Sequence, residues 1–193
     1  NYLLFTLLTF GLLIMSCGSK GGPDLSPEAS TKTVKNLPDW YLNTPVNDGY
    51  QYAAAEATSQ SMQLAVDKAR VAAVSNLSQM IKSEWNGYTK RVQEETGMGE
   101  DSQLLDQFST TQENVISNQL ENVIVKEKEI QVENSGGTRI YRTFVLVELD
   151  ENAAQDKLLA QIKADQQLYD AIKASELVDE MEQKVEAYRQ RKQ

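Results

Sequence analysis

Cys17 is the residue whose type and position point most directly to chemistry, and it is the only cysteine in the chain. It follows an uncharged apolar run over residues 2–15 and comes directly after Ser16. The run has the length of a secretory signal core, about 7 to 15 residues, and is shorter than the roughly 20 residues of a membrane-spanning helix. Ile14, Met15, Ser16 and Cys17 resemble a lipobox, although Met15 is bulkier than usual. The pattern predicts that the Cys17 thiol is acylated, for example with palmitate.

The segments on either side of Cys17 agree with this interpretation. We interpret residues 1–16 as a lipoprotein signal peptide, truncated because the chain begins at Asn1 without a methionine or a basic segment. Residues 17–35 contain Gly, Ser and Pro in a polar setting and are predicted to form a flexible tether. Two alternatives remain at this point: a free thiol at the end of an uncleaved membrane anchor, and a chance cysteine in a secretory signal.

The overall charge of the chain limits which binding partners can be expected. The chain has 193 residues, a formal net charge of −9 and a pI near 4.6. Nucleic-acid binding depends on clustered Lys and Arg, so we expect no nucleic-acid partner. The same acidity repels an anionic membrane surface. We therefore expect the membrane to be bound through acyl chains on Cys17, each buried methylene adding about 0.8 kcal/mol.

Residue types also limit the possible catalysis. The chain contains no histidine, which excludes a Ser-His-Asp or Cys-His nucleophilic system and the commonest transition-metal ligand. No Walker sequence or paired-glycine fingerprint occurs, and Gly97, Gly99, Gly136 and Gly137 lie in polar loops. We expect no catalytic residue, no cofactor, no metal site and no enzymatic activity.

A folded domain is predicted over residues 36–150. Residues 36–45 carry two prolines and an aromatic pair, so we expect an extended entry that docks on the domain edge with Trp40 in the core. Residues 50–57 follow an Asn-Asp-Gly turn signal and predict a strand. Residues 81–95 include Trp85, a glycine and several β-favouring residues, and predict a second strand.

Two helices are predicted within this domain. Residues 59–82 contain no Gly or Pro, and small and apolar residues recur at spacings of three and four, which indicates an amphipathic helix packed closely on a sheet. The stripe consists of Ala65, Val66, Ala69, Ala72, Ala73, Leu77 and Met80. Residues 101–120 predict a further helix with a weaker apolar side.

The strongest β signal lies near the end of the domain. Residues 123–132 and 139–149, joined by a turn at 134–137, predict a long hairpin. The second of these strands is apolar on both faces, so we expect it to be central. Residues 126–129 alternate Lys and Glu and are expected to be solvated, which discourages edge pairing.

Residues 151–193 contain neither Gly nor Pro and predict one long helix, capped at its start by Asp150 or Asn152. Its first stripe is Leu158, Ile162, Tyr169 and Ile172, and a heptad-like series follows: Ala171, Ala174, Val178, Met181, Val185 and Tyr188. Such spacing is typical of a coiled coil, although the series is under three heptads. We expect either self-association or a protein partner through this helix, or packing on its own domain.

Together these elements predict an α+β fold in which a small antiparallel sheet packs on helices. The predicted order is β-α-β-α-β-β, followed by the long C-terminal helix. Removing the signal and the tether leaves about one domain's worth of chain, large enough for its own core.

Several of these motifs occur together in one known family. The lipobox, the Pro-Asp-Trp-Tyr entry, the strand followed by an alanine-rich helix, and a hairpin ending Arg-Thr-Phe-Val-Leu-Val-Glu-Leu resemble the Lpp-twenty-like outer-membrane lipoprotein family. This resemblance covers about residues 37–149, and the chain also looks like the amino-terminal domain of the flagellar basal-body protein T. The resemblance implies an α+β domain tethered to the outer membrane without established catalysis, with Cys17 as the functional position.

The expected function is therefore a non-catalytic lipoprotein of the bacterial cell envelope whose domain offers an interaction surface. Two alternatives belong to other classes. Abundant Asp and Glu are compatible with a carboxylate-dependent envelope hydrolase, since glycosidic chemistry needs no histidine. A carrier of an apolar ligand would require an internal cavity between sheet and helices.

Overall fold

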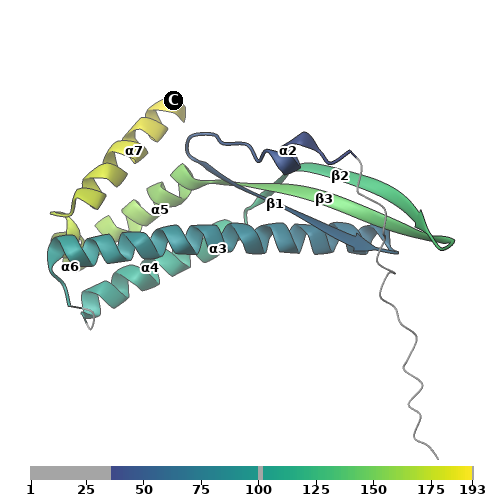
Figure 1. The fold of residues 1–193 in the computed structure, drawn as a ribbon. Helices are drawn as coiled ribbons and strands as arrows, with labels where there is room; N and C mark the ends of the chain where they lie inside the picture. Colours follow the sequence, from purple (N-terminus) through teal and green to yellow (C-terminus); the bar gives the residue numbers. More distant parts are fainter. Residues whose placement is uncertain (1–35, 100–101, 193) are drawn as a thin grey trace, which may run out of the picture.

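The computed structural model describes residues 36–99 and 102–192 (Figure 1). The predicted signal peptide, Cys17 and the predicted tether over residues 17–35 lie outside the described residues. In chain order the elements are α2 (Asp39–Leu42), β1 (Tyr50–Ser59), α3 (Met62–Thr96), α4 (Gln103–Leu120), β2 (Ile124–Ser135), β3 (Thr138–Asp150), α5 (Glu151–Ala164), α6 (Gln166–Ile172) and α7 (Glu176–Lys192). The predicted mixture of helices with a small antiparallel sheet is confirmed.

The sheet has three antiparallel strands in the order β1-β3-β2. The predicted hairpin is confirmed as β2 and β3, and β3 is central as expected. Its turn uses Gly136 and Gly137, both with positive φ (56° and 83°), which is the backbone that a tight two-residue hairpin requires. Residues 143–149 of β3 are all buried, so the strand is covered on both faces.

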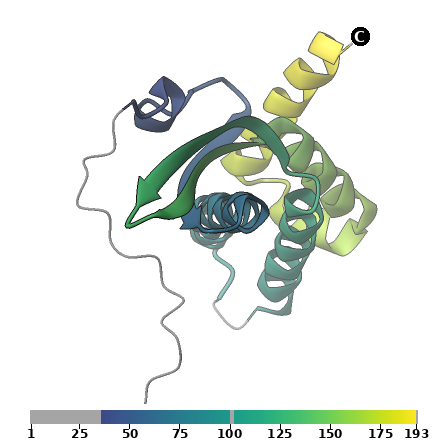
Figure 2. The same cartoon turned by 90° about the vertical axis from the view of Figure 1, so that its right-hand side faces the viewer.

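The long helix α3 lies against the sheet along its first part and against the other helices along its second part (Figure 1), and the sheet curves around it (Figure 2). It begins at the N-cap Ser61, whose side chain accepts a hydrogen bond from Leu64 N at 3.4 Å. Ala65, Ala69 and Ala73 are fully buried. Because alanine adds only a methyl group, the helix backbone approaches the strands closely, as predicted.

The strand predicted over residues 81–95 is wrong, because α3 continues through this segment to Thr96. Ile81, Trp85 and Val92 extend the buried stripe at helical spacing, so tertiary packing overrides the weak local helix preference. The predicted β-α-β-α-β-β order is corrected to β-α-α-β-β. A smaller error concerns Met80, expected in the stripe, which is 47% exposed.

The predicted extended entry is instead the single-turn helix α2, on the sheet face opposite α3 (Figure 1). The ring of Tyr41 meets Phe144 of β3 edge-on, with centroids 5.0 Å apart. Trp40 is only half-buried and contacts Tyr41, so its predicted core position is wrong. In a helical turn successive side chains differ by about 100° in direction. Tyr41 therefore faces the sheet and Trp40 does not.

The predicted single helix over residues 151–193 is three helices. Asp150 caps α5 as expected, accepting from Ala153 N at 2.9 Å. Asp165 ends α5 and caps α6, because its carboxylate accepts from Gln167 N and Leu168 N at 3.1 and 3.0 Å. No helix of the described ranges is both long and apolar enough to cross a membrane.

The heptad-like series packs within the chain. Val178, Met181 and Val185 are each 2% exposed and belong to the main hydrophobic core, with α7 lying across α5. Ala174, in contrast, is exposed. A partner that binds through α7 would therefore have to contact its outer, polar face.

Candidate functional site

The predicted lipidation residue, Cys17, lies outside the described residues, so its surroundings are not part of the structure. No catalytic or cofactor-binding residue was predicted. The structure nevertheless brings together polar side chains that the sequence had not indicated. Two groups join α3 to the C-terminal helices: the carboxylate cluster, defined as Gln51, Glu84, Tyr88, Glu151 and Gln155, and the α7 clamp, defined as Arg91, Glu95, Ser175, Leu177 and Glu180.

The carboxylate cluster is centred on one amide. Nε2 of Gln51, near the start of β1, donates to Glu84 Oε2 at 3.0 Å and to Glu151 Oε2 at 3.1 Å. Glu84 comes from the middle of α3 and Glu151 is the first residue of α5. Both carboxylates are partly buried. Residues from β1, α3 and the sequence-distant α5 therefore meet at a pair of acidic groups.

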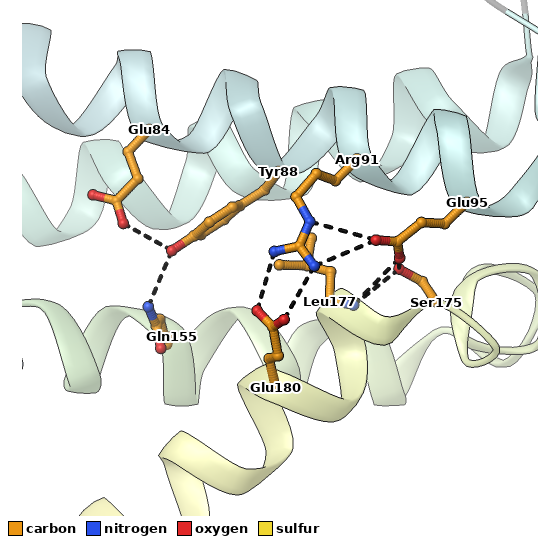
Figure 3. Close-up of polar contacts among 8 residues, drawn as sticks. All are labelled: Glu84, Tyr88, Arg91, Glu95, Gln155, Ser175, Leu177 and Glu180. Atoms are coloured by element: carbon orange, nitrogen blue, oxygen red, sulfur yellow. Dashed lines mark hydrogen bonds and ion pairs between the residues drawn. The ribbon is translucent and has the colours of Figure 1, made fainter.

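Two more side chains complete the carboxylate cluster. The hydroxyl of Tyr88 donates to Glu84 Oε1 at 2.8 Å, and Gln155 Nε2 lies 3.4 Å from that hydroxyl (Figure 3). Gln155 Nε2 also donates to Glu151 Oε1 at 2.7 Å. Burial raises the pKa of Tyr88, and the hydrogen bond to Glu84 raises it further. The phenol therefore stays protonated and acts as a donor.

The pair of carboxylates has an electrostatic consequence. Burial raises the pKa of Glu151, and the adjacent charge of Glu84 raises it further. The amide of Gln51 and the more distant charge of Lys184 on α7 act in the opposite direction. A glutamate with a raised pKa beside a second carboxylate is the chemical arrangement of a general acid.

The space beside Glu84 and Glu151 limits the chemistry that these two carboxylates can perform. The cavity beside Glu84 and Glu151 measures about 10 Å³, and its other walls include Trp85, Ile116 and Leu149. This is roughly the space of one water molecule. A sugar ring does not fit into this cavity, whereas glycosidic chemistry needs the two carboxylates on opposite sides of a substrate. The geometry supports a structural link between β1, α3 and α5.

The α7 clamp fixes the start of α7 on α3 (Figure 3). Glu95 accepts hydrogen bonds from Ser175 Oγ and, at 3.3 Å, from Leu177 N. Arg91 donates to both carboxylate oxygens of Glu180 at 3.0 and 3.1 Å. The hydrogen bond from Ser175 lowers the pKa of Glu95. A carboxylate at a helix N-terminus also interacts favourably with the helix dipole, so α7 starts at a fixed position.

A third polar group lies on the sheet face that α2 covers. Glu148 of β3 is 7% exposed, and its Oε2 accepts from Tyr52 Oη at 2.7 Å and pairs with Lys126 Nζ at 3.0 Å. Asn47 Nδ2 donates to the Tyr52 hydroxyl at 2.7 Å. The ion pair satisfies the buried carboxylate. Glu148 could have been noticed in the sequence, because it is the only charged residue within the apolar run 143–149.

Comparisons with known proteins found no matching family model, no matching curated protein and no matching solved structure. The resemblance to the Lpp-twenty-like family therefore stays a prediction from the sequence. Within residues 36–99 and 102–192, no group of three or more Cys, Asp or Glu side chains is placed to hold a metal ion.

Proposed function

We propose that the protein is a non-catalytic lipoprotein of the bacterial outer membrane, held by acyl chains on Cys17. The observation that carries this proposal is the uncharged apolar run that ends in Ser16 and Cys17, followed by the polar segment 18–35 before the folded domain. The domain then serves as an interaction module of the cell envelope.

The contacts within the domain support a role without catalysis. The carboxylate cluster and the α7 clamp both connect α3 to the C-terminal helices, and every charged member has a partner inside its group. The cavity next to the carboxylate pair has room for about one water molecule. This volume does not favour the hydrolase alternative, since a hydrolase that used the carboxylate pair would need a substrate pocket there.

The outer surface of the C-terminal helices is a better candidate for a protein-binding site than an apolar coiled-coil seam on α7. The apolar side of α7 is occupied by its own chain, as the 2% exposure of Met181 and Val185 illustrates. The remaining surface is polar and includes Asp179, Gln183 and Glu186, all exposed. A partner at this surface would be recognised by charge and hydrogen bonding.

Membrane fractionation tests the proposal. The gene with a complete signal is expressed as wild type, as Cys17→Ala and as the matched control Ser19→Ala, which changes a residue just beyond the lipobox. We expect the wild type and the control to be recovered in the outer-membrane fraction and in the detergent phase. Cys17→Ala should leave both. Equal membrane recovery of all three proteins would refute lipid anchoring at Cys17.

A further inference from the structure

The leading segment, defined as residues 36–49, crosses the sheet face opposite α3 (Figure 1). At its start, Asn36 O accepts a hydrogen bond from Gln131 Nε2 of β2 at 2.7 Å. Near its end, Asn47 Nδ2 donates to Tyr52 Oη of β1 at 2.7 Å. The leading segment is therefore held at both edge strands and lies across the width of the sheet.

Large apolar side chains of the leading segment lie in solvent. Leu42 is 60% exposed and Val46 is 95% exposed. Trp40 is half-buried and points away from the sheet, which Tyr41 contacts instead. Single exposed apolar residues are ordinary on a protein surface, so Leu42 or Val46 alone would need no explanation.

Two strand residues add to the same side of the sheet. Tyr50 of β1 is 39% exposed and lies opposite Asp150, and Ile124 of β2 is 54% exposed and lies opposite Glu148. Because side chains alternate along a strand, Glu148 and Asp150 share the face of Phe144, on which α2 lies. The exposed apolar groups on this side are called the apolar face and consist of Trp40, Leu42, Val46, Tyr50 and Ile124.

The chemistry of the apolar face fits a membrane interface. Trp and Tyr combine an apolar ring with a polar group and gather where lipid headgroups meet acyl chains. Aliphatic side chains are stabilised by burial at that boundary. The leading segment contains Asp39 and Asp48 but neither Lys nor Arg, and nearby Lys126 is paired with Glu148 at 3.0 Å. The apolar face therefore suits a zwitterionic bilayer rather than an anionic one.

The sequence places the apolar face close to the proposed lipid anchor. Only residues 18–35 separate the leading segment from Cys17. A short covalent connection of this kind holds a domain at a high effective concentration near the surface to which it is attached. A contact made by a few side chains, too weak to bind a free protein to a vesicle, is then occupied in the anchored protein.

We propose that the apolar face contacts a phospholipid bilayer at the boundary between headgroups and acyl chains. The proposal rests on the membrane anchor proposed at Cys17, and it adds a docked orientation of the domain to that anchor. In this orientation α3, which covers the opposite face of the sheet, is directed away from the membrane (Figure 1).

Tryptophan fluorescence tests this docking in the full chain. The protein recovered from membranes after expression with a complete signal is reconstituted into phosphatidylcholine vesicles, with or without a nitroxide high on the acyl chain. The chain has two tryptophans, and Trp85 is 2% exposed inside the core. We expect the nitroxide to reduce wild-type emission and to leave Trp40→Phe emission unchanged. Wild-type emission that the nitroxide does not change would overturn the proposal.

Two exposed valines provide matched variants. Val46→Asp places a charge in the apolar face, and Val132→Asp places the same charge on β2 at a position that is 55% exposed. Val132 lies opposite Tyr141 of β3, so its side chain is on the α3 side of the sheet. We expect Val46→Asp to lose the quenching and Val132→Asp to keep it. Quenching that persists in Val46→Asp, or that both variants lose, would contradict the proposal.

Vesicle flotation separates this docking from the proposed anchor. Protein that floats with the vesicles while Trp40 stays unquenched would refute the docking and leave the anchor intact. Protein that does not float would refute the anchor, and coupling the Cys17 thiol to a maleimide lipid then allows the same quenching test. An unquenched wild type that forms a dimer in detergent, which Val46→Asp dissociates, would assign the apolar face to a second copy of the chain.

Discussion

Glu84 and Glu151, which lie far apart in the sequence, accept hydrogen bonds from the same amide nitrogen of Gln51, at 3.0 and 3.1 Å. This shared donor joins the edge strand β1 to α3 and to the start of α5. Two ionised carboxylates this close to one donor repel each other. Protonation of one of them removes this repulsion and stabilises the arrangement. The link is therefore sensitive to pH.

Replacing Glu151 by glutamine should reduce the pH dependence of stability. The pKa of Glu151 is raised in the folded protein, first by burial and then by Glu84. The stabilising proton is therefore fully bound below the ordinary glutamate pKa of about 4.3, and its contribution is lost as the pH rises through the raised pKa. In urea unfolding, Glu151→Gln should therefore gain stability relative to wild type as the pH rises from about 5 to about 8.

The matched control for that measurement is Glu127→Gln, which neutralises an exposed carboxylate on β2. It should shift the unfolding free energy by the same small amount at both pH values. A Glu151→Gln protein whose pH dependence equals that of wild type would show that the carboxylate pair does not share a proton.

Ser175→Ala should destabilise the protein by about 1 to 2 kcal/mol, because it removes a fully buried hydroxyl that bonds to Glu95 and accepts from Leu177 N. Arg91→Gln should cost less than about 1 kcal/mol, since the Arg91 and Glu180 side chains are 38% and 52% exposed. Chemical unfolding at neutral pH ranks the two variants. The opposite ranking would contradict this assignment of the α7 clamp.

The stability that the α7 clamp contributes is lost at low pH. The pKa of Glu95 is lowered, chiefly by the hydrogen bond from Ser175, so its contribution is present above the ordinary glutamate pKa and is lost as the pH falls through the lowered value. The stability difference between wild type and Ser175→Ala should therefore shrink in acid.

Asp165→Ala should cost about 1 kcal/mol or more, because Asp165 caps α6 with two hydrogen bonds and also accepts from Gln107 Nε2 on α4. Asp170→Ala is the control, as Asp170 is exposed and its partners in the described part of the chain are the nearby Gln166 and Lys173. Thermal unfolding should separate the two variants. Equal melting temperatures would mean that the break between α5 and α6 does not depend on this cap.

The two tryptophans give a direct test of the corrected helix. Trp85 is 2% exposed inside α3, and its truncation to alanine should cost about 3 to 5 kcal/mol. Trp40 is half-buried on α2, so Trp40→Ala should cost less than about 2 kcal/mol. Urea unfolding of both variants measures the difference. Similar losses would be inconsistent with the described positions.

Local signals were sufficient for the hairpin and for the start of α3. Gly136 and Gly137 flanked by alternating residues indicate a turn, and the run without Gly or Pro from residue 59 placed the start of α3 to within three residues, since Ser59 ends β1 and Ser61 is the N-cap. Residues 81–95 were misjudged because aromatic and β-branched residues favour strands locally, whereas burial of Trp85 and Val92 at helical spacing decides the outcome.

The polar contacts were harder to predict from the sequence. The helix breaks at Asp165 and Ser175 use side-chain caps without Gly or Pro, and the same residue types also occur within continuous helices, where they point to solvent. The pairing of Glu84 with Glu151 depends on how α5 returns to α3, which no local pattern encodes. Cys17 is the opposite case, because its prediction comes from sequence alone.

The most direct test of the central proposal is the intact mass and N-terminal residue of the protein recovered from membranes after expression with a complete signal. The account predicts a chain that begins at Cys17 and is heavier than its polypeptide by acyl groups. A chain that still carries residues 1–16, or one without acyl mass, would contradict it.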